Sequence, residues 1–367
     1  MENTEKRFLS LLASPTVLLG PTPASAAPPD YFYDFSLPVE GGKLYFRNRY
    51  GPMEVVGADL ALTELVIPAS ANGAPVTQIA GQAFAGHQNL IRAAIPDSVT
   101  AICDGAFTGC EQLEQVNIPD GVTLLHDNVF NGCASLTSIK LPSDVTRIGN
   151  YAFRDCASLA SIRIPAGVTV LESMAFSGCT RLTDVAIPYG VTRIGYCAFS
   201  ECEGLTEVSI PDSVSALDYG AFESCTGLTH VWLSNRVIAI GYGAFSGCER
   251  LTHVTLPNSV TLIDDYAFFN CTSLTGVVLP DHAVKLGRYA FAGCANLTRA
   301  DIPASVTEIG DYAFSLLRDA GMDEWGDTIW EKRPIPGLTI CGQSGSAAEL
   351  WCEESGIPFV PCATPSL

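Results

Sequence analysis

Basic residues are scarce in this chain of 367 residues, which has 20 Lys and Arg against 39 Asp and Glu. The formal net charge of −19 opposes binding to a nucleic-acid backbone or to an anionic lipid surface. Long apolar runs are also lacking, because none reaches the roughly 18 residues that a membrane-spanning helix needs. We therefore expect no nucleic-acid partner and no membrane span.

Sequence signatures of catalysis and of metal binding are lacking as well. The chain has no C-x-x-C pair, no G-x-S-x-G nucleophile motif and no glycine-rich phosphate loop. No nucleophile stands in a pattern that would supply it with a base and an orienting group. We predict a protein that is not an enzyme, with no catalytic residue, no cofactor and no metal site.

What the chain does have is an internal repeat of 23 residues. A Phe recurs at this interval over eleven copies without an insertion, and Val, Ile or Leu recur at fixed offsets from it. Such regularity predicts a solenoid in which each copy buries its apolar layer against its neighbours. The repeat Phe residues are Phe84, Phe107, Phe130, Phe153, Phe176, Phe199, Phe222, Phe245, Phe268, Phe291 and Phe314.

One copy, residues 136–158, shows how the repeat is expected to fold. Leu136, Ile139 and Leu141 have the L-x-x-L-x-L spacing of leucine-rich repeats. Ile139 and Leu141 are two residues apart, so they share the inner face of a short strand, which Pro142 ends. "VTRI" predicts a second extended piece, and "YAFRDC" predicts a turn or 3₁₀ segment on the outer side. The fold class is a leucine-rich repeat solenoid with short parallel strands in a curved sheet and terminal caps.

Nine of the fourteen cysteines stand three residues after a repeat Phe. We interpret them as a file of buried free thiols, because unpaired Cys behaves as a small apolar residue. Disulfides between adjacent copies and metal ligation are the two alternatives, but a single file of sulfurs does not surround an ion. The file consists of Cys110, Cys133, Cys156, Cys179, Cys202, Cys225, Cys248, Cys271 and Cys294. The sequence leaves open whether Cys341, Cys352 and Cys362, near the C-terminus, form a disulfide.

Residues 1–27 combine Lys6 and Arg7, an apolar stretch and Ala24-Ser25-Ala26, as in a signal peptide. A secreted or cell-surface protein is therefore expected; the alternative is a tail that is not exported and a cytoplasmic protein. Residues 28–61 predict an N-terminal β cap, and residues 62–318 hold the repeats.

Residues 319–367 are expected to form a C-terminal cap; the alternative is a separate functional module. The segment "RDAGMDEWGDTIWEKRP" is acidic and shows no regular pattern. Ser346 and Glu349 then form a capping-box pattern, Gly356 stands where the helix would end, and "GIPFV" predicts a final strand.

The repeat motif IPxxVTxIGxxAFxxCxxL, seen in "LPSDVTRIGNYAFRDCASL" (141–159), resembles the BspA-like, or treponemal-type, leucine-rich repeat family. The segments "ANGAPVTQIAGQAF" and "GSAAELWCEESGIPFV" are similar to the flanking segments of that family. The resemblance covers about residues 60–360. It implies a surface or secreted protein, in many cases bacterial, that binds host matrix proteins or other cells.

Binding is expected on the outward face of the strands, which the repeats present in file. The eighth copy places Trp232 where other copies have small or polar residues, and its turn, "SNRV", lacks the usual Pro. An exposed Trp is a frequent anchor of interfaces. The hypothesis is a partner-binding patch; the alternatives are neutral variation at exposed positions and a weak metal site made by the histidines with the Glu. The patch consists of Asp184, Glu207, His230, Trp232 and His253.

These observations together predict a non-enzymatic binding protein that mediates protein–protein contacts or cell–matrix adhesion. The expected partner is a host matrix or cell-surface protein, with a polysaccharide as the second choice. The alternative is a structural spacer without a dedicated ligand.

Overall fold

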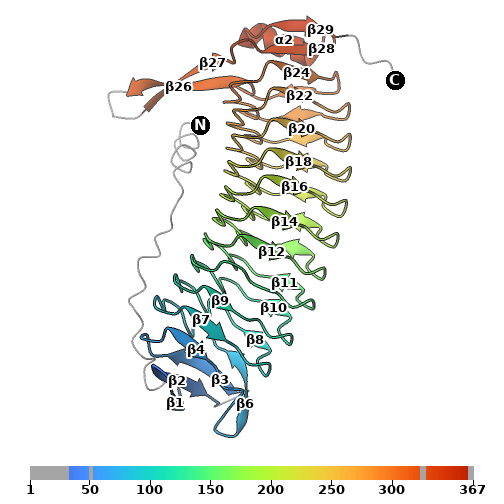
Figure 1. Ribbon diagram of the computed structural model, residues 1–367. Helices are drawn as coiled ribbons and strands as arrows, with labels where there is room; N and C mark the ends of the chain where they lie inside the picture. The colour runs from blue at the N-terminus through green and yellow to red at the C-terminus, as the bar shows by residue number, and fades with distance from the viewer. Residues whose placement is uncertain (1–32, 49–52, 323–327, 363–367) are drawn as a thin grey trace.

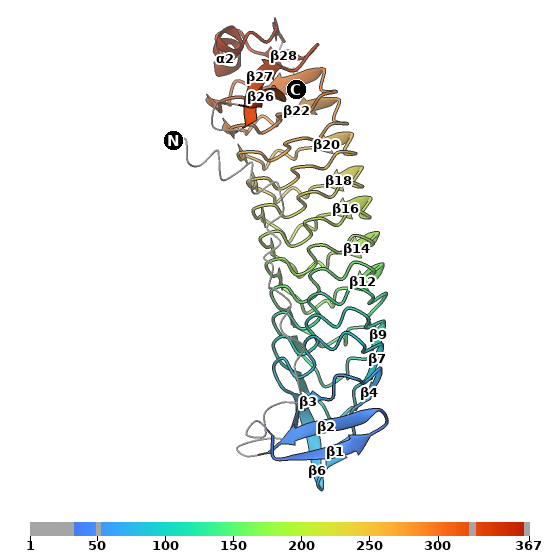
Figure 2. The same cartoon turned by 90° about the vertical axis from the view of Figure 1, so that its left-hand side faces the viewer.

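The chain winds into one elongated solenoid, with further strands at its N-terminal end and with strands and a helix at its C-terminal end (Figures 1 and 2). The computed structural model describes residues 33–48, 53–322 and 328–362. The predicted signal peptide, residues 1–27, lies outside the described residues. The predicted fold class, a leucine-rich repeat solenoid, is confirmed.

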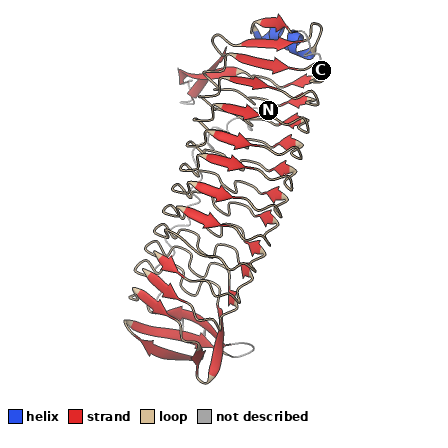
Figure 3. Ribbon diagram, turned by 45° about the vertical axis from the view of Figure 1, so that its right-hand side comes forward, coloured by secondary structure: helices blue, strands red, loops and turns tan. Residues whose placement is uncertain are grey.

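One file of short parallel strands, here called the front strands, comes from the L-x-x-L-x-L segments (Figure 3). Neighbours pair in register one repeat apart, as Ser161 does with Asp184. In most of them the middle residue is buried and its two neighbours point outward, which is the alternation expected of a strand with one solvated face. The front strands are β4 (Glu64–Val66), β7 (Arg92–Ala94), β9 (Gln115–Val116), β12 (Ser161–Arg163), β14 (Asp184–Ala186), β16 (Glu207–Ser209), β18 (His230–Trp232), β20 (His253–Thr255), β22 (Gly276–Val278) and β24 (Arg299–Ile302).

A second file, the back strands, comes from the V-T-x-I segments. Nine of these strands, β10 to β25, form one continuous parallel sheet, whereas the front file is divided into shorter hydrogen-bonded groups. The back strands are β8 (Ala101–Ile102), β10 (Leu124–Leu125), β11 (Arg147–Ile148), β13 (Val170–Leu171), β15 (Arg193–Ile194), β17 (Ala216–Leu217), β19 (Ala239–Ile240), β21 (Leu262–Ile263), β23 (Lys285–Leu286) and β25 (Glu308–Ile309).

The core between the two files consists of apolar columns that run along the solenoid. The eleven repeat Phe side chains are fully buried, and each ring stacks on the next at centroid distances of 5.1–5.6 Å. A Leu column, six residues after the Phe in the first ten copies, is buried in the same way, as Leu159 and Leu182 show. The residues that define the 23-residue period are therefore the residues that form the core.

The outer segments are hydrogen-bonded turns that bracket each Phe. The position two residues before the Phe has a positive φ in all eleven copies, from Gln82 to Tyr312. The position two residues after it has a positive φ in ten of them, as at Gly109 (φ 69°) and Asp155 (φ 56°). Residues with a Cβ atom adopt this conformation at an energetic cost, whereas Gly adopts it freely. This explains why Gly is frequent at these two positions.

The N-terminal end of the solenoid is covered by β1 (Phe35–Val39), β2 (Gly42–Arg47) and β3 (Met53–Ala58), which pair antiparallel. Strand β3 then pairs parallel with β6 (Ala74–Ile79), which pairs with the back strand β8 and, antiparallel, with β5 (Ser70–Ala71). These strands cover the edge that the first repeat would otherwise expose.

The C-terminal end contains a feature that the sequence did not indicate. Strands β26 (Ser315–Met322) and β27 (Thr328–Pro334) pair as an antiparallel hairpin, in a segment without a regular pattern. Its pairing depends on cross-strand partners and not on the 23-residue phase. Strand β28 (Thr339–Gly342) then pairs with β24, helix α2 (Ala347–Ser355) follows, and β29 (Phe359–Pro361) pairs with β28.

Of the two end signals predicted for helix α2, the one at the C-terminus is confirmed and the one at the N-terminus is wrong. Gly356 adopts the left-handed conformation (φ 75°) and donates its N–H to the Cys352 carbonyl, so the C-cap is confirmed. The predicted capping box is wrong, because the Ser346 side chain makes no capping hydrogen bond. The Glu349 carboxylate instead accepts a hydrogen bond from the Gly345 N–H at 2.6 Å, one residue before the N-cap.

Candidate functional site

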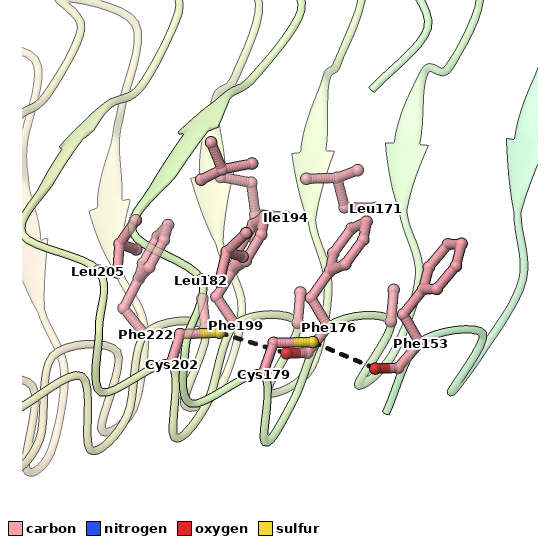
Figure 4. Packing of buried hydrophobic residues seen from close by; sticks show 14 of the residues in the cluster. Phe153, Leu171, Phe176, Cys179, Leu182, Ile194, Phe199, Cys202, Leu205 and Phe222 are labelled. Atoms are coloured by element: carbon pink, nitrogen blue, oxygen red, sulfur yellow. Dashed lines mark hydrogen bonds between the residues drawn. The ribbon is translucent and has the colours of Figure 1, made fainter. Parts of the chain in front are cut away.

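The nine cysteines of the predicted thiol file lie inside the solenoid. Each side chain is fully buried, and each Sγ lies 3.1–3.3 Å from the carbonyl oxygen of the Phe in the preceding copy. Figure 4 shows this for Cys179, which donates to Phe153, and for Cys202, which donates to Phe176. The thiol therefore fills space and satisfies a second lone pair on a buried carbonyl.

Burial also makes these thiols poor nucleophiles. It raises the pKa of Cys110 and of Cys225 to about 12, and it raises the pKa of Cys156 well above the ordinary value. The thiolate is the reactive form, so a thiol with a raised pKa is inert at neutral pH. All fourteen cysteines are unpaired in the structure.

The first copy has His87 where the other copies have the file Cys. Its ring is buried, stands edge-on to Phe84 and places Nε2 3.2 Å from the carbonyl oxygen of Ala58 at the end of β3. Burial lowers the pKa of His87, because desolvation outweighs the hydrogen bonds to the backbone. His87 is thus a neutral contact between the repeats and the N-terminal strands.

The five residues of the predicted patch lie on consecutive front strands and point outward; we call them the exposed strip. Glu207 on β16 pairs with His230 on β18, and His230 pairs with His253 on β20. Asp184 on β14 lies at the edge of the strip, since β14 pairs with β12 and only adjoins β16. The structure thus brings the Glu, the Trp and the two His into one hydrogen-bonded group of strands.

Trp232 is the largest apolar side chain exposed on this face, with 52% of its surface accessible. Its ring stacks on His230 at a centroid distance of 5.9 Å and an interplanar angle of 15°. The Nδ1 of His230 lies 3.0 Å from the Thr229 hydroxyl, and the Trp232 carbonyl accepts a hydrogen bond from the Ile210 N–H. The indole therefore stacks on an imidazole that itself has a hydrogen-bond partner, and about half of the Trp232 surface is accessible to solvent.

The missing Pro in the "SNRV" turn leaves the backbone turn unchanged. Val237 N–H donates to the Ser234 carbonyl, as Val214 N–H donates to the Pro211 carbonyl one repeat earlier. The Ser234 hydroxyl also accepts a hydrogen bond from the Arg236 N–H at 3.3 Å. The unusual turn thus holds Trp232 in the ordinary geometry of the repeat.

Lys and Arg are absent from the outward positions of five consecutive front strands, β14 to β22. Arg163 on β12 and Arg299 on β24 are the nearest basic residues in the two outward columns. The interval holds two carboxylates, two imidazoles, the indole and the exposed Val278. This strip suits a partner whose contacting surface carries basic and apolar groups.

The side chains of Glu207, His230 and His253 do not form a compact ligand set. Within the described residues, the group of three His, Cys, Asp or Glu side chains whose ligand atoms lie within 4.8 Å of one another is Asp301, Cys341 and Cys362, at the C-terminal end. The histidines of the strip therefore do not favour a metal site.

Six tyrosines form a stack along the outer turns, which was not predicted from the sequence. Successive rings lie 4.7–5.3 Å apart, and the Lys332 ammonium lies 3.9 Å from the centroid of the last ring. The sequence does contain a pattern that indicates this stack. Tyr precedes the repeat Phe by three residues in three copies and by two residues in the next three. The stack consists of Tyr196, Tyr219, Tyr242, Tyr266, Tyr289 and Tyr312.

Cys197, the residue after the first of these tyrosines, has a carboxyl group next to its thiol. Glu223 Oε2 is 4.0 Å from the Cys197 Sγ. Burial raises the pKa of Glu223 to about 7, with a further contribution from the charge of Glu201. Burial likewise raises the pKa of Cys197 to about 12. The pair lacks the lowered thiol pKa of a catalytic Cys, so it does not indicate a nucleophile.

The stacked copies, their two strand files and their continuous Phe, Leu and Cys columns define a leucine-rich repeat protein. The profile described as "BspA type Leucine rich repeat region (6 copies)" matches residues 77–206 and 197–319. The chain belongs to this family. Among curated protein sequences, none matches the chain significantly.

Solved structures share the fold. The chain is similar to a leucine-rich repeat protein from Bacteroides ovatus, with 24% identity over 90% of this chain and all of that chain and a TM-score of 0.55. It is also similar to the pneumococcal vaccine antigen PcpA, with 16% identity over the same shares and a TM-score of 0.54. In the described part of the chain, no helix has the length and apolar character needed to cross a membrane.

Proposed function

We propose that this protein is a non-enzymatic binding protein, secreted or displayed on a bacterial cell surface, and that the exposed strip binds another protein. The observation that carries the proposal is Trp232, a half-exposed indole supported by a stacked imidazole on an ordered parallel sheet. A large aromatic side chain that is already ordered loses little conformational freedom on binding, which is why such residues anchor interfaces.

The side chains of the strip restrict the kinds of partner that it could bind. Asp184 and Glu207 lie on one side of Trp232, and Val278 extends the apolar surface on the other. A matrix or cell-surface protein with a basic and apolar patch complements this arrangement. The resemblance to BspA-like proteins supports adhesion as the biological outcome, and a polysaccharide that stacks a sugar ring on the indole is the second candidate.

Substitution of Trp232 tests the proposal. Full-length protein is passed over immobilised fibronectin, laminin and collagen and over a panel of bacterial and host polysaccharides, and binding is measured by surface plasmon resonance. Trp232→Ala is expected to weaken binding to the recognised partner about tenfold or more, because it removes the anchor.

Val66→Ala is the matched control. Val66 is exposed, apolar and located in the same outward column, but on the distant strand β4. Its substitution is expected to leave the affinity within about twofold of the unsubstituted protein. Equal losses in the two variants would exclude the strip as the binding surface. A protein that retains none of the probes would favour the alternative of a structural spacer.

A further inference from the structure

Two cysteines meet at the C-terminal end of the front file. Cys341 on β28 lies opposite Asp301 of β24 on one side and opposite Val360 of β29 on the other. Cys362 follows β29 directly, and its N–H donates to the Gly342 carbonyl at 2.9 Å. The two sulfur atoms and an Asp301 oxygen lie within 4.8 Å of one another.

The positions of the three C-terminal cysteines identify the pair that can react. Cys341 belongs to an outward column, yet only 2% of its surface is accessible, and Cys362 is the partly exposed thiol beside it. Cys352 lies in α2 and packs into the apolar core instead. The sequence left the pairing among these three open, and the fold brings two of them together.

The cluster could either bind a metal ion or form a disulfide, and the position of Arg299 favours the disulfide. Its Nη2 lies 3.7 Å from the Cys362 Sγ, and its Nε donates to the Asp301 carboxylate at 2.7 Å. A guanidinium at this place repels a metal cation and already engages two of the three ligands that the cation would need. The two sulfur atoms therefore remain available for thiol–disulfide exchange with each other.

We propose that Cys341 and Cys362 form a disulfide by exchange with a low-molecular-weight disulfide such as glutathione disulfide. The Cys362 thiolate attacks one sulfur of glutathione disulfide and releases one glutathione thiolate. The Cys341 thiolate then attacks the Cys362 sulfur of the mixed disulfide and releases the second glutathione. The two protons of the protein thiols end on the two glutathione molecules, so the protein is oxidised and the glutathione disulfide is reduced.

The order of the two steps follows from the surroundings of the two thiols. Cys362 is partly exposed whereas Cys341 is buried, so Cys362 meets the oxidant first. Burial, followed by the interaction with Cys362, raises the pKa of Cys341 to about 12. Cys341 is therefore the resolving thiol, which reacts within the protein after Cys362 has formed the mixed disulfide.

The bond would close a loop that contains helix α2 and strand β29. Strand β28 pairs with β24, the last front strand of the repeats, so the bond ties the final strand to the end of the solenoid. A cross-link of this kind restricts opening of the closed segment. The inference is independent of the proposed function, since it concerns strands β28 and β29 at the C-terminal end and not the exposed strip.

The test is peptide mapping of the full-length protein after incubation with glutathione disulfide. Free thiols are alkylated in denaturant and the digest is analysed by mass spectrometry. A disulfide-linked peptide pair containing Cys341 and Cys362 is expected, with the other twelve cysteines alkylated. Hydrogen exchange of the backbone amides in residues 339–362 is expected to slow about tenfold on oxidation.

Two variants and a metal analysis complete the test. Cys362→Ser should abolish both the linked pair and the change in hydrogen exchange, whereas Cys103→Ser, which removes a partly exposed thiol elsewhere, should abolish neither. Alkylation of both Cys341 and Cys362 after oxidation would overturn the proposal, as would a linked pair between other residues. Stoichiometric zinc in the purified protein that is lost in Cys362→Ser would also overturn it, in favour of a metal site with Asp301.

Discussion

Replacement of Phe153 with alanine is expected to lower the free energy of unfolding by about 3–5 kcal/mol. The Phe153 ring is fully buried and stacks between Phe130 and Phe176, at centroid distances of 5.6 Å to each. Removal of the ring opens a cavity in the middle of the Phe column, which the neighbouring copies cannot close without losing their strand register. Chemical denaturation followed by circular dichroism measures the change.

Tyr189→Ala is the control for this prediction. Tyr189 is also aromatic, but 74% of its surface is accessible. Its substitution should change the stability by no more than about 0.5 kcal/mol. If Phe153→Ala were as mild as Tyr189→Ala, the Phe column would not be the core of the solenoid.

Glu223→Gln is expected to stabilise the protein by about 2–3 kcal/mol at pH 8 and to change little at pH 4.5. Burial, with a smaller contribution from the charge of Glu201, raises the pKa of Glu223 from 4.5 to about 7 in the folded protein. Between these two values the folded chain keeps a proton that the unfolded chain has released. Stability therefore falls as the pH rises through this window, and the cost of burying the carboxylate is complete above pH 7.

Gln is neutral at every pH and has nearly the shape of protonated Glu, so it removes this cost alone. Urea denaturation of both proteins at pH 4.5 and pH 8 gives two differences in stability, and their comparison cancels the contribution of every other titrating group. A difference that did not change with pH would show that Glu223 is ionised to the same extent in the folded and unfolded chains.

The repeat architecture was predictable because the columns that carry the 23-residue period are the columns that pack. A side chain at a fixed phase, such as Phe153 or Leu159, meets the same side chain of the next copy, so periodicity translates directly into contact. The outward position of Trp232 followed from the same alternation, since it is next to the buried Val231 in its strand.

Features that depend on contacts outside this phase were not predictable. The β26–β27 hairpin is set by pairs such as Leu316 with Arg333, which no repeat contains. The Glu349 carboxylate reaches the amide of Gly345 and not that of Ser346, a difference of one residue that depends on the path of the chain before the helix. The meeting of Cys341 and Cys362 likewise requires the parallel pairing of β28 with β29.

The Cys file lies between these two cases. The period predicts that the thiols are buried, but it says nothing of their hydrogen bonds. The acceptor for Cys179 is the carbonyl of Phe153, which lies 26 residues earlier and in another copy. This separation of 26 residues in the sequence is longer than one repeat. The hydrogen bond could therefore be identified only from the structure, in which the copies are stacked.

The most direct test of the buried columns is to count reactive thiols with a water-soluble aromatic disulfide reagent, first on the folded protein and then in denaturant without reductant. The nine cysteines of the file are fully buried and unpaired. All nine thiols are therefore expected not to react with the reagent in the folded protein and to react once the protein is unfolded. Reaction of these thiols in the folded protein, or fewer than nine of them reacting after unfolding, would contradict a solenoid whose recurring residues form continuous interior files.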